Sequence, residues 1–189
     1  MRPIKKRLAR GFTLIELMIV VAIVGILAVL AIYGVRKYMA SAKTTEARTQ
    51  LGLMSKDAVS AYERESSPGA VLQGANVAAI SHALCPNAAQ NPATVPAANK
   101  TQPDPALWKN DAGWACLKFT IDTPTYYAYS YFSDYTVGMT TGGTKFTAQA
   151  NGDLNGDGIK STFQMLGDTV SNPGQLTLAP NMTVTLEEE

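Results

Sequence analysis

Oxygen-bearing side chains recur at alternate positions in the stretch 153–164. Its first six residues read Asp-Leu-Asn-Gly-Asp-Gly, which follows the opening of a calcium-binding loop. Oxygens at alternate positions can surround one hard cation, and glycine at the sixth position permits the sharp turn. The candidate ligands are Asp153, Asn155, Asp157, the carbonyl of Ile159 and Ser161. Gln164 stands where such loops carry a bidentate glutamate, so the alternative is a polar β-turn without metal.

Enzymatic chemistry has little support in the rest of the sequence. The single histidine, His82, lies three residues before Cys85, but no Asn or Asp that would orient a Cys–His nucleophile is discernible. We find no nucleophile elbow, no paired metal-binding histidines and no dinucleotide fingerprint. The formal net charge of +1 argues against a sequence-independent nucleic-acid binder, which needs a basic surplus. We predict that the chain is not an enzyme and has no cofactor other than the candidate calcium ion.

One carboxylate, Glu16, lies inside the long apolar run 12–32. As a helix this run spans roughly 32 Å, enough to cross a bilayer core of ~30 Å. Residues 1–10 carry five basic side chains and no acidic one. This flank predicts a single membrane pass with the N-terminus in the cytoplasm and the chain after Ile32 outside.

A cleaved secretory signal and a plain membrane anchor explain the run less well. The apolar part of a secretory signal usually has about 7–15 residues and ends in a small-residue cleavage site, whereas this run is longer and ends in Ala31-Ile32-Tyr33. A plain anchor gives no reason for Glu16, because ionisable residues inside membrane segments are rare and usually functional.

The stretch GFTLIELMIVVAIVGILA, residues 11–28, resembles the N-terminal signature of type IV pilins and the related pseudopilins. The resemblance implies that a prepilin peptidase cuts between Gly11 and Phe12, and that the new amino group of Phe12 is then N-methylated. It also implies that the apolar helix stays in the bilayer of the inner membrane. Inner-membrane assembly machinery would then draw the subunit into a filament with copies of itself and other pilins.

Glu16 fits this resemblance on physical grounds. A carboxylate inside an apolar bundle is costly unless it meets an opposite charge. The methylated amino group of Phe12 on a neighbouring subunit is cationic, and such a pair would fix the register between subunits, as a buried polar residue does in a coiled coil. The alternative is that Glu16 lies at the lipid interface without a role.

One position departs from the family pattern. Many members carry a proline after the Ala-Ile pair, where the helix can loosen during assembly, and this chain has Tyr33-Gly34 instead. Glycine also weakens a helix, by ~1 kcal/mol relative to alanine. The departure leaves open how the helix would loosen.

Cys85 and Cys116 are the only cysteines, and we predict that they form a disulfide. Both follow the membrane segment and therefore lie in an oxidising compartment. Closing a loop of this length would stabilise the fold by ~3–4 kcal/mol in the chain-entropy model.

The periodicities predict an α+β protein: one long N-terminal helix packed on a C-terminal antiparallel sheet. This is the pilin fold that the resemblance implies. The predicted segments are a leader (1–11), a transmembrane and assembly helix (12–33), an amphipathic continuation (34–65), a loop region (66–113) and a sheet head (114–189). Within them we expect a helical turn near 77–83, a hairpin turn at 140–144, and strands at 114–121, 126–132, 145–151, 161–165, 175–178 and 182–186.

These observations favour a structural subunit of a type IV pilus-like filament, extracellular or periplasmic, that serves adhesion, motility or DNA uptake. The alternatives are a pseudopilin of a type II secretion system, a minor pilin that primes or tips the fibre, and an anchored binding or sensory domain that never polymerises. After residue 65 the chain has 5 basic and 10 acidic residues, so its acidic head argues against direct nucleic-acid binding.

Overall fold

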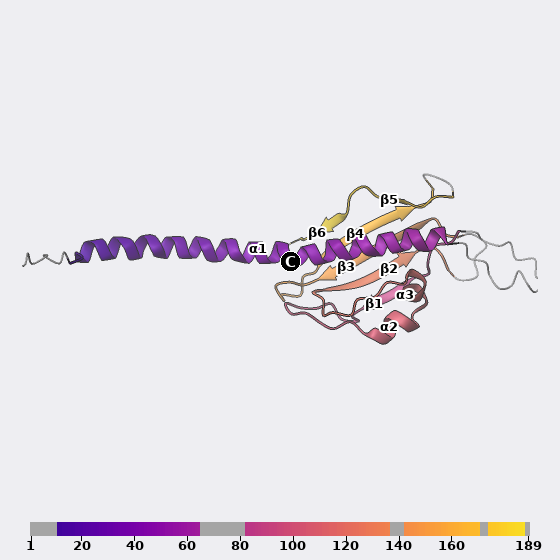
Figure 1. The fold of residues 1–189 in the computed structure, drawn as a ribbon, viewed down its shortest axis with the longest axis horizontal. Coiled ribbons are helices and arrows are strands. Elements are labelled where there is room, and N and C mark those ends of the chain that lie inside the picture. The colour runs from indigo at the N-terminus through magenta and orange to yellow at the C-terminus, as the bar shows by residue number, and fades with distance from the viewer. Residues whose placement is uncertain (1–10, 65–81, 137–141, 171–173, 188–189) are drawn as a thin grey trace, which may run out of the picture. The chain divides into compact units, whose positions relative to one another are not determined.

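The computed structural model describes residues 11–64, 82–136, 142–170 and 174–187 (Figure 1). The helices are α1 (Leu14–Glu63), α2 (Pro105–Asn110) and α3 (Ala112–Leu117). The strands are β1 (Ala88–Asn91), β2 (Tyr127–Ser133), β3 (Lys145–Gly152), β4 (Ser161–Asp168), β5 (Thr177–Leu178) and β6 (Thr183–Thr185). The chain divides into two compact units between Met39 and Ala40, and each is described by itself.

The first unit holds the apolar part of α1. All side chains of residues 11–39 are exposed, including every Leu, Ile, Val and Met of this stretch. Among the described residues, α1 is the helix long and apolar enough to cross a membrane. An apolar surface of this extent is far larger than soluble proteins leave in water.

The second unit is an antiparallel sheet with the later turns of α1 packed on one face (Figure 1). The strand order is β1-β2-β3-β4-β5, and β6 also pairs with β4. Along β3 the side chains alternate: Phe146 and Ala148 are buried towards α1, while Lys145 and Thr147 lie on the opposite face. We call that opposite face the outer face of the sheet. The predicted α+β class, a long helix on an antiparallel sheet, is confirmed.

Small and apolar side chains of α1 meet a column of tyrosines on β2. The buried side chains of α1 are Thr44, Ala47, Leu51, Met54, Ser55, Ala58, Ala61 and Tyr62. Tyr127, Tyr129 and Tyr131 are fully buried at alternate positions of β2, as expected for one face of a strand. Burial raises the pKa of the Tyr127 hydroxyl to about 12, so the column stays neutral at any physiological pH.

The predicted strand 114–121 is wrong, because residues 112–117 form the helix α3. Asp111 caps this helix by accepting hydrogen bonds from the backbone N–H groups of Gly113 and Trp114, at 2.9 and 3.1 Å. Trp114 and Leu117 are three residues apart, so in a helix both reach the core. The alternation that suggested a strand begins only after the helix, with the buried Phe119 and Ile121.

The strand β1 lies in the predicted loop region, and α3 covers its edge. The backbone N–H of Ala89 donates to the carboxylate of Asp111 at 3.2 Å, and the Trp114 indole N–H donates to the Ala89 carbonyl at 2.8 Å. The other five predicted strands match β2 to β6 within a few residues. The predicted turn at 77–83 falls mostly outside the described residues. Of the predicted hairpin turn at 140–144, residues 142–144 are described, and they lead directly into β3.

Two helix glycines test this packing, because helix propensity alone favours alanine at both by about 0.5–1 kcal/mol. A Cβ atom at Gly52 in α1 would meet nothing within 4 Å, whereas one at Gly113 in α3 would lie 2.5 Å from the Asn87 carbonyl oxygen. We expect Gly52→Ala to raise the free energy of unfolding and Gly113→Ala to lower it, by roughly 1–3 kcal/mol. Urea unfolding of the full chain in detergent measures both, and changes of the same sign would contradict the packing described.

Candidate functional site

The start of α1 is held by Thr13 and Glu16. The Glu16 carboxylate oxygen Oε2 accepts from the Thr13 backbone N–H at 2.9 Å and from the Thr13 hydroxyl at 2.7 Å. The Thr13 hydroxyl oxygen in turn accepts from the Glu16 N–H at 3.3 Å. This reciprocal arrangement is a capping box, which satisfies backbone donors that a helix N-terminus leaves open.

The capping box gives Glu16 a partner inside its own chain, which the sequence interpretation missed. The signal was present as Thr13-x-x-Glu16, the spacing typical of a capping box. Both bonds from Thr13 go to Oε2. The pairing of Glu16 with the amine of a neighbouring subunit stays a prediction.

The predicted cleavage point lies directly before this cap. Gly11 and Phe12 have no helical or strand structure and are exposed, with Phe12 86% accessible. Residues 1–10 of the predicted leader lie outside the described residues. Both residues of this peptide bond are therefore accessible and free of helix or strand hydrogen bonding, as proteolytic cleavage requires.

The departure at Tyr33-Gly34 does not interrupt α1, which continues helical through both residues. Tyr33 is exposed, and a Cβ atom at Gly34 would meet nothing within 4 Å. Gly34 is therefore not required by packing within the chain. It is a position where helix propensity is low and no side chain compensates.

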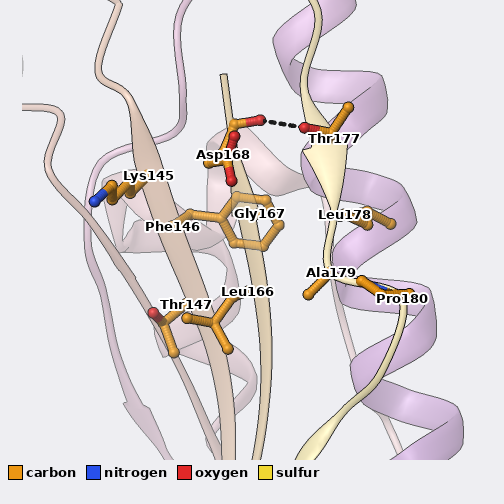
Figure 2. Close-up of a pocket in the computed structure, with 10 residues that line it drawn as sticks. All are labelled: Lys145, Phe146, Thr147, Leu166, Gly167, Asp168, Thr177, Leu178, Ala179 and Pro180. Atoms are coloured by element: carbon orange, nitrogen blue, oxygen red, sulfur yellow. Dashed lines mark hydrogen bonds between the residues drawn. The ribbon is translucent and has the colours of Figure 1, made fainter. Parts of the chain in front are cut away.

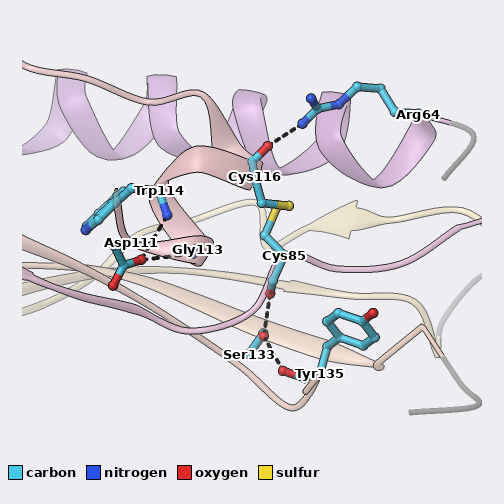
Figure 3. Close-up of a disulfide and its surroundings, with 8 residues drawn as sticks. All are labelled: Arg64, Cys85, Asp111, Gly113, Trp114, Cys116, Ser133 and Tyr135. Carbon is cyan, nitrogen blue, oxygen red and sulfur yellow. Dashed lines mark hydrogen bonds between the residues drawn. A yellow bond between two sulfur atoms is a disulfide. The ribbon is translucent and has the colours of Figure 1, made fainter. Parts of the chain in front are cut away.

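The predicted disulfide between Cys85 and Cys116 is confirmed (Figure 3). Their Cα atoms are 5.6 Å apart across a separation of 31 residues. The bond joins the segment before β1 to α3. Arg64, after the end of α1, donates to the Cys116 carbonyl, and the Ser133 hydroxyl donates to the Cys85 carbonyl at 2.6 Å. The disulfide thus stands where the end of α1, α3 and the end of β2 meet.

His82 does not form a nucleophilic pair with Cys85. Its ring stacks on Tyr62 with centroids 5.4 Å apart, and its Nδ1 lies 3.1 Å from the Tyr62 carbonyl oxygen. Because Cys85 is in the disulfide, its sulfur is not a free thiol.

The candidate calcium loop joins β3 to β4. Asp153 is only 5% exposed, and its two carboxylate oxygens accept from the N–H groups of Gly156 at 2.6 Å and Gly158 at 3.0 Å. The Asp157 carboxylate accepts from the Ile159 N–H at 2.7 Å, and the Asn155 side-chain oxygen from the Asp157 N–H at 2.9 Å. Each side-chain oxygen therefore stabilises a turn of the loop itself.

Of the two remaining candidate ligands, Ile159 is 50% exposed, and the side chain of Ser161 is turned to another partner. Its side chain is fully buried, and its hydroxyl donates to the Gly152 carbonyl at 3.1 Å. Across the described residues, no three His, Cys, Asp or Glu side chains gather into one group, and a calcium ion in this loop would depend on amide, hydroxyl and carbonyl oxygens as well. Calcium binding by this loop stays a prediction.

Calcium binding is tested best at Asp157, because the Asp153 carboxylate also holds the loop together. If the loop binds Ca²⁺, the ion stabilises the folded chain by about 2.7 kcal/mol at a concentration of 100 Kd, and the melting temperature rises. Asp157→Asn keeps an oxygen for the Ile159 N–H and should abolish the rise, whereas Asp122→Asn, at an exposed acid elsewhere, should keep it. No rise with Ca²⁺, or a rise that survives Asp157→Asn, would overturn the prediction.

Known proteins resemble this chain at its N-terminal end. Residues 6–32 match the family model described as the prokaryotic N-terminal methylation motif. The type IV major pilin protein PilA of Myxococcus xanthus is 64% identical over 42 residues, which are 22% of this chain and 19% of that protein. The type IV major fimbrial protein FimA of Dichelobacter nodosus is 51% identical over 49 residues, 26% of this chain and 31% of that protein.

A further relative extends the match slightly. The fimbrial protein EcpC of Eikenella corrodens is 49% identical over 57 residues, 30% of this chain and 37% of that protein. This chain thus spans between about a fifth and two fifths of the length of these curated relatives. No solved structure matches it. The predicted resemblance to type IV pilins is confirmed at the N-terminal segment, which carries the methylation motif.

Proposed function

We propose that this chain is a structural subunit of a type IV pilus-like filament that assembles through its apolar N-terminal helix. The observation that carries the proposal is the methylation motif over residues 6–32. The motif runs into α1, whose side chains are all exposed up to Met39. A prepilin peptidase would cut after Gly11, and the new amino group of Phe12 would be methylated. The filament would serve adhesion, motility or DNA uptake.

The exposed apolar helix supports both stages of this life cycle. Before assembly a bilayer buries residues 12–32, with the basic leader in the cytoplasm and the head outside. In a filament, copies of the same helix and other pilins bury it instead. Either environment removes the apolar surface of residues 12–32 from water. The core of the second unit contains none of these residues.

Glu16 would link the subunits of the filament. Its carboxylate stays at the N-terminal end of α1, held by Thr13, where the helix dipole favours a negative charge. The methylated amine of Phe12 on a neighbouring subunit carries the opposite charge. In an apolar bundle this ion pair would form in only one axial register. Any other register would leave two buried charges unpaired, which is strongly destabilising.

The Cys85–Cys116 disulfide supports a head outside the cytoplasm, because disulfides persist in oxidising compartments. These features do not distinguish the pilus subunit from a pseudopilin of a type II secretion system or from a minor pilin, which are the alternatives. A membrane-anchored domain that never polymerises is a weaker alternative, because the methylation motif has no use in it.

The processing step has a direct test. Mass spectrometry of the chain isolated from membranes or sheared fibres should find N-methylated Phe12 as the first residue. Gly11→Val should leave the precursor uncut, because the branched side chain stands at the cleavage point, while Gly25→Val, at an open position inside the helix, should still be processed. A mature chain that begins at Met1 would sink the proposal.

Two substitutions separate the charge of Glu16 from its role in the cap. Glu16→Gln keeps the length of the side chain and can still complete a capping box, but it cannot pair with a cation. We expect Glu16→Gln and Glu16→Ala to reduce filament yield in shear preparations alike, with membrane insertion unchanged. If Glu16→Gln assembles normally while Glu16→Ala does not, the carboxylate acts only as a cap and the intersubunit ion pair is refuted.

A further inference from the structure

The connection between β3 and β4 contains the dipeptides of this chain that are most prone to spontaneous backbone chemistry. Asn-Gly occurs twice in the sequence, at 151–152 and 155–156, and Asp-Gly occurs once, at 157–158. In such a dipeptide the glycine nitrogen can attack the side-chain Cγ of the residue before it, because glycine has no side chain that hinders the approach. All three dipeptides lie at the end of β3 or in the loop that follows it.

The attack at Asn-Gly produces a cyclic succinimide. A bond forms between the glycine nitrogen and Cγ, the bond between Cγ and the side-chain nitrogen breaks, and the proton of the glycine N–H leaves with the released ammonia. Water then opens the ring and leaves either aspartate or isoaspartate, in which the main chain continues through the side-chain carbonyl. At Asp-Gly a water molecule leaves in place of ammonia, and the same two products form. Both reactions need a glycine nitrogen that can turn towards Cγ and give up its proton.

The conformation of the loop requires glycine at both of its reactive positions. Gly156 and Gly158 have φ angles of +79° and +90°, which residues with a side chain rarely adopt. The side chain before each glycine stabilises a turn: the Asn155 oxygen accepts from the Asp157 N–H at 2.9 Å, and the Asp157 carboxylate accepts from the Ile159 N–H at 2.7 Å. The turns of this loop therefore place an Asn or Asp directly before a glycine twice.

The Asp153 carboxylate binds both of the glycine nitrogens that would attack. Its Oδ1 accepts from the Gly156 N–H at 2.6 Å, and its Oδ2 accepts from the Gly158 N–H at 3.0 Å. Asp153 is itself held in place, because it is nearly buried and its backbone carbonyl accepts from the Ala98 N–H at 2.7 Å. Hydrogen bonds to a carboxylate are stronger than those between neutral groups. Each nitrogen must break such a bond before it can react.

The strands on either side of the loop fix its two ends. β3 and β4 pair in continuous register from Lys145 with Asp168, at the end far from the loop (Figure 2), to Gly152 with Ser161, directly beside it. The Ser161 hydroxyl also donates to the Gly152 carbonyl at 3.1 Å. With its ends fixed by the sheet, the middle of the loop depends on Asp153 for its conformation.

The other Asn-Gly dipeptide is protected by the sheet and not by Asp153. Asn151 and Gly152 lie within β3, which pairs with β2 on one side and β4 on the other, and ladder hydrogen bonds hold each peptide unit of a strand in place. On the outer face, the Asn151 side-chain oxygen accepts from Gln149 and Thr162, both at 3.0 Å. Reaction at Asn151 therefore requires the sheet to open, so its rate reports the integrity of the fold.

We propose that the Asp153 carboxylate protects the exposed loop from succinimide formation at Asn155 and Asp157, and that Asn155 is the first residue to deamidate when this protection is lost. Deamidation there replaces a neutral amide by a negative charge, and isoaspartate adds a carbon atom to the main chain of a turn. This role needs neither a metal ion nor polymerisation. It can therefore fail or succeed independently of the calcium prediction and of the proposed filament function.

The test incubates the full chain in detergent at mildly alkaline pH, with a chelator so that calcium contributes nothing. Trypsin then releases residues 146–160, between Lys145 and Lys160, as one peptide that contains all three dipeptides. Mass spectrometry with fragmentation measures deamidation at Asn151 and Asn155 and isoaspartate at Asp157. We expect Asn155 to react in the folded chain about tenfold or more slowly than in the same chain unfolded by urea and a reductant, because the bond to the carboxylate must first break.

Asp153→Ala removes both acceptor oxygens. We expect it to accelerate deamidation at Asn155 and isoaspartate formation at Asp157 by about tenfold or more in the folded chain, with the rate at Asn151 unchanged. Asp134→Ala is the matched control, because the Asp134 carboxylate also accepts from two backbone N–H groups, at 2.7 and 3.0 Å, beside the far end of β3. It should leave the rates in the loop unchanged.

A general loss of stability is recognised at Asn151, because unfolding of the sheet would accelerate all three sites together. If Asp153→Ala does so, Asp153→Asn replaces it. The amide keeps the shape of the side chain but has one acceptor oxygen, so it can hold only one of the two glycine N–H groups. At least one of the two loop reactions should then accelerate while Asn151 stays slow.

Two results would overturn the proposal. The first is that Asn155 reacts as fast in the folded chain as in the unfolded chain, which would mean that the loop has no protection. The second is that neither substitution of Asp153 accelerates a loop reaction more than it accelerates the reaction at Asn151, which would assign the protection to the fold as a whole.

Discussion

The chain cannot bury residues 12–32 within their own unit, and the rest of the architecture depends on that constraint. Their side chains are exposed throughout, and apolar surface in water costs about 25 cal/mol per Å². No single hydrogen bond, at about 1 kcal/mol net, offsets such a cost. The second unit accordingly takes nothing from this run for its own core, which begins on α1 at Thr44 and continues through the tyrosines of β2. The single helix α1 thus has two parts. Its apolar first part must be removed from water, and its later turns, from Thr44 on, pack on the sheet of a fold that is stable in water.

Polar groups in the apolar segment have to be satisfied locally, and the capping box shows how. A helix N-terminus leaves four backbone N–H groups without intrahelical partners, and unsatisfied groups are most costly where water is scarce. Three hydrogen bonds between Thr13 and Glu16 satisfy two of these groups, the backbone N–H of Thr13 and that of Glu16. The one ionisable residue of the run therefore stands where both the backbone and the helix dipole favour a carboxylate. A role between subunits, as proposed, adds to this local role and does not replace it.

The sequence predicted those elements whose patterns are strong and local. The helix period of α1 and the alternation of β2, β3 and β4 were sufficient to place them, and the two cysteines were enough to predict their bond. The strand β1 was missed because Ala-Ala-Gln-Asn has no β-branched or aromatic residue. The helix α3 was mistaken for a strand because the signal for its start is Asp111, its N-cap. In the sequence alone an Asp at such a position indicates a turn as readily as a helix cap. The hydrogen bonds of Asp111 and Trp114 to Ala89 could not be predicted either, because they join segments about 22 to 25 residues apart whose approach depends on the whole sheet.

The covering of β1 by α3 has a consequence for heads held at high density. An open strand edge offers unpaired N–H and C=O groups to any other chain within reach, and such edges join sheets into aggregates. At β1 the backbone groups of Ala89 are already hydrogen-bonded. Its N–H donates to the Asp111 carboxylate, and its carbonyl accepts from the Trp114 indole N–H. At the opposite side the sheet ends in strands of two and three residues, β5 and β6. Crowded copies of this head would therefore touch through side chains while each sheet remains a closed unit, so packing many heads together would not convert them into one continuous β-structure.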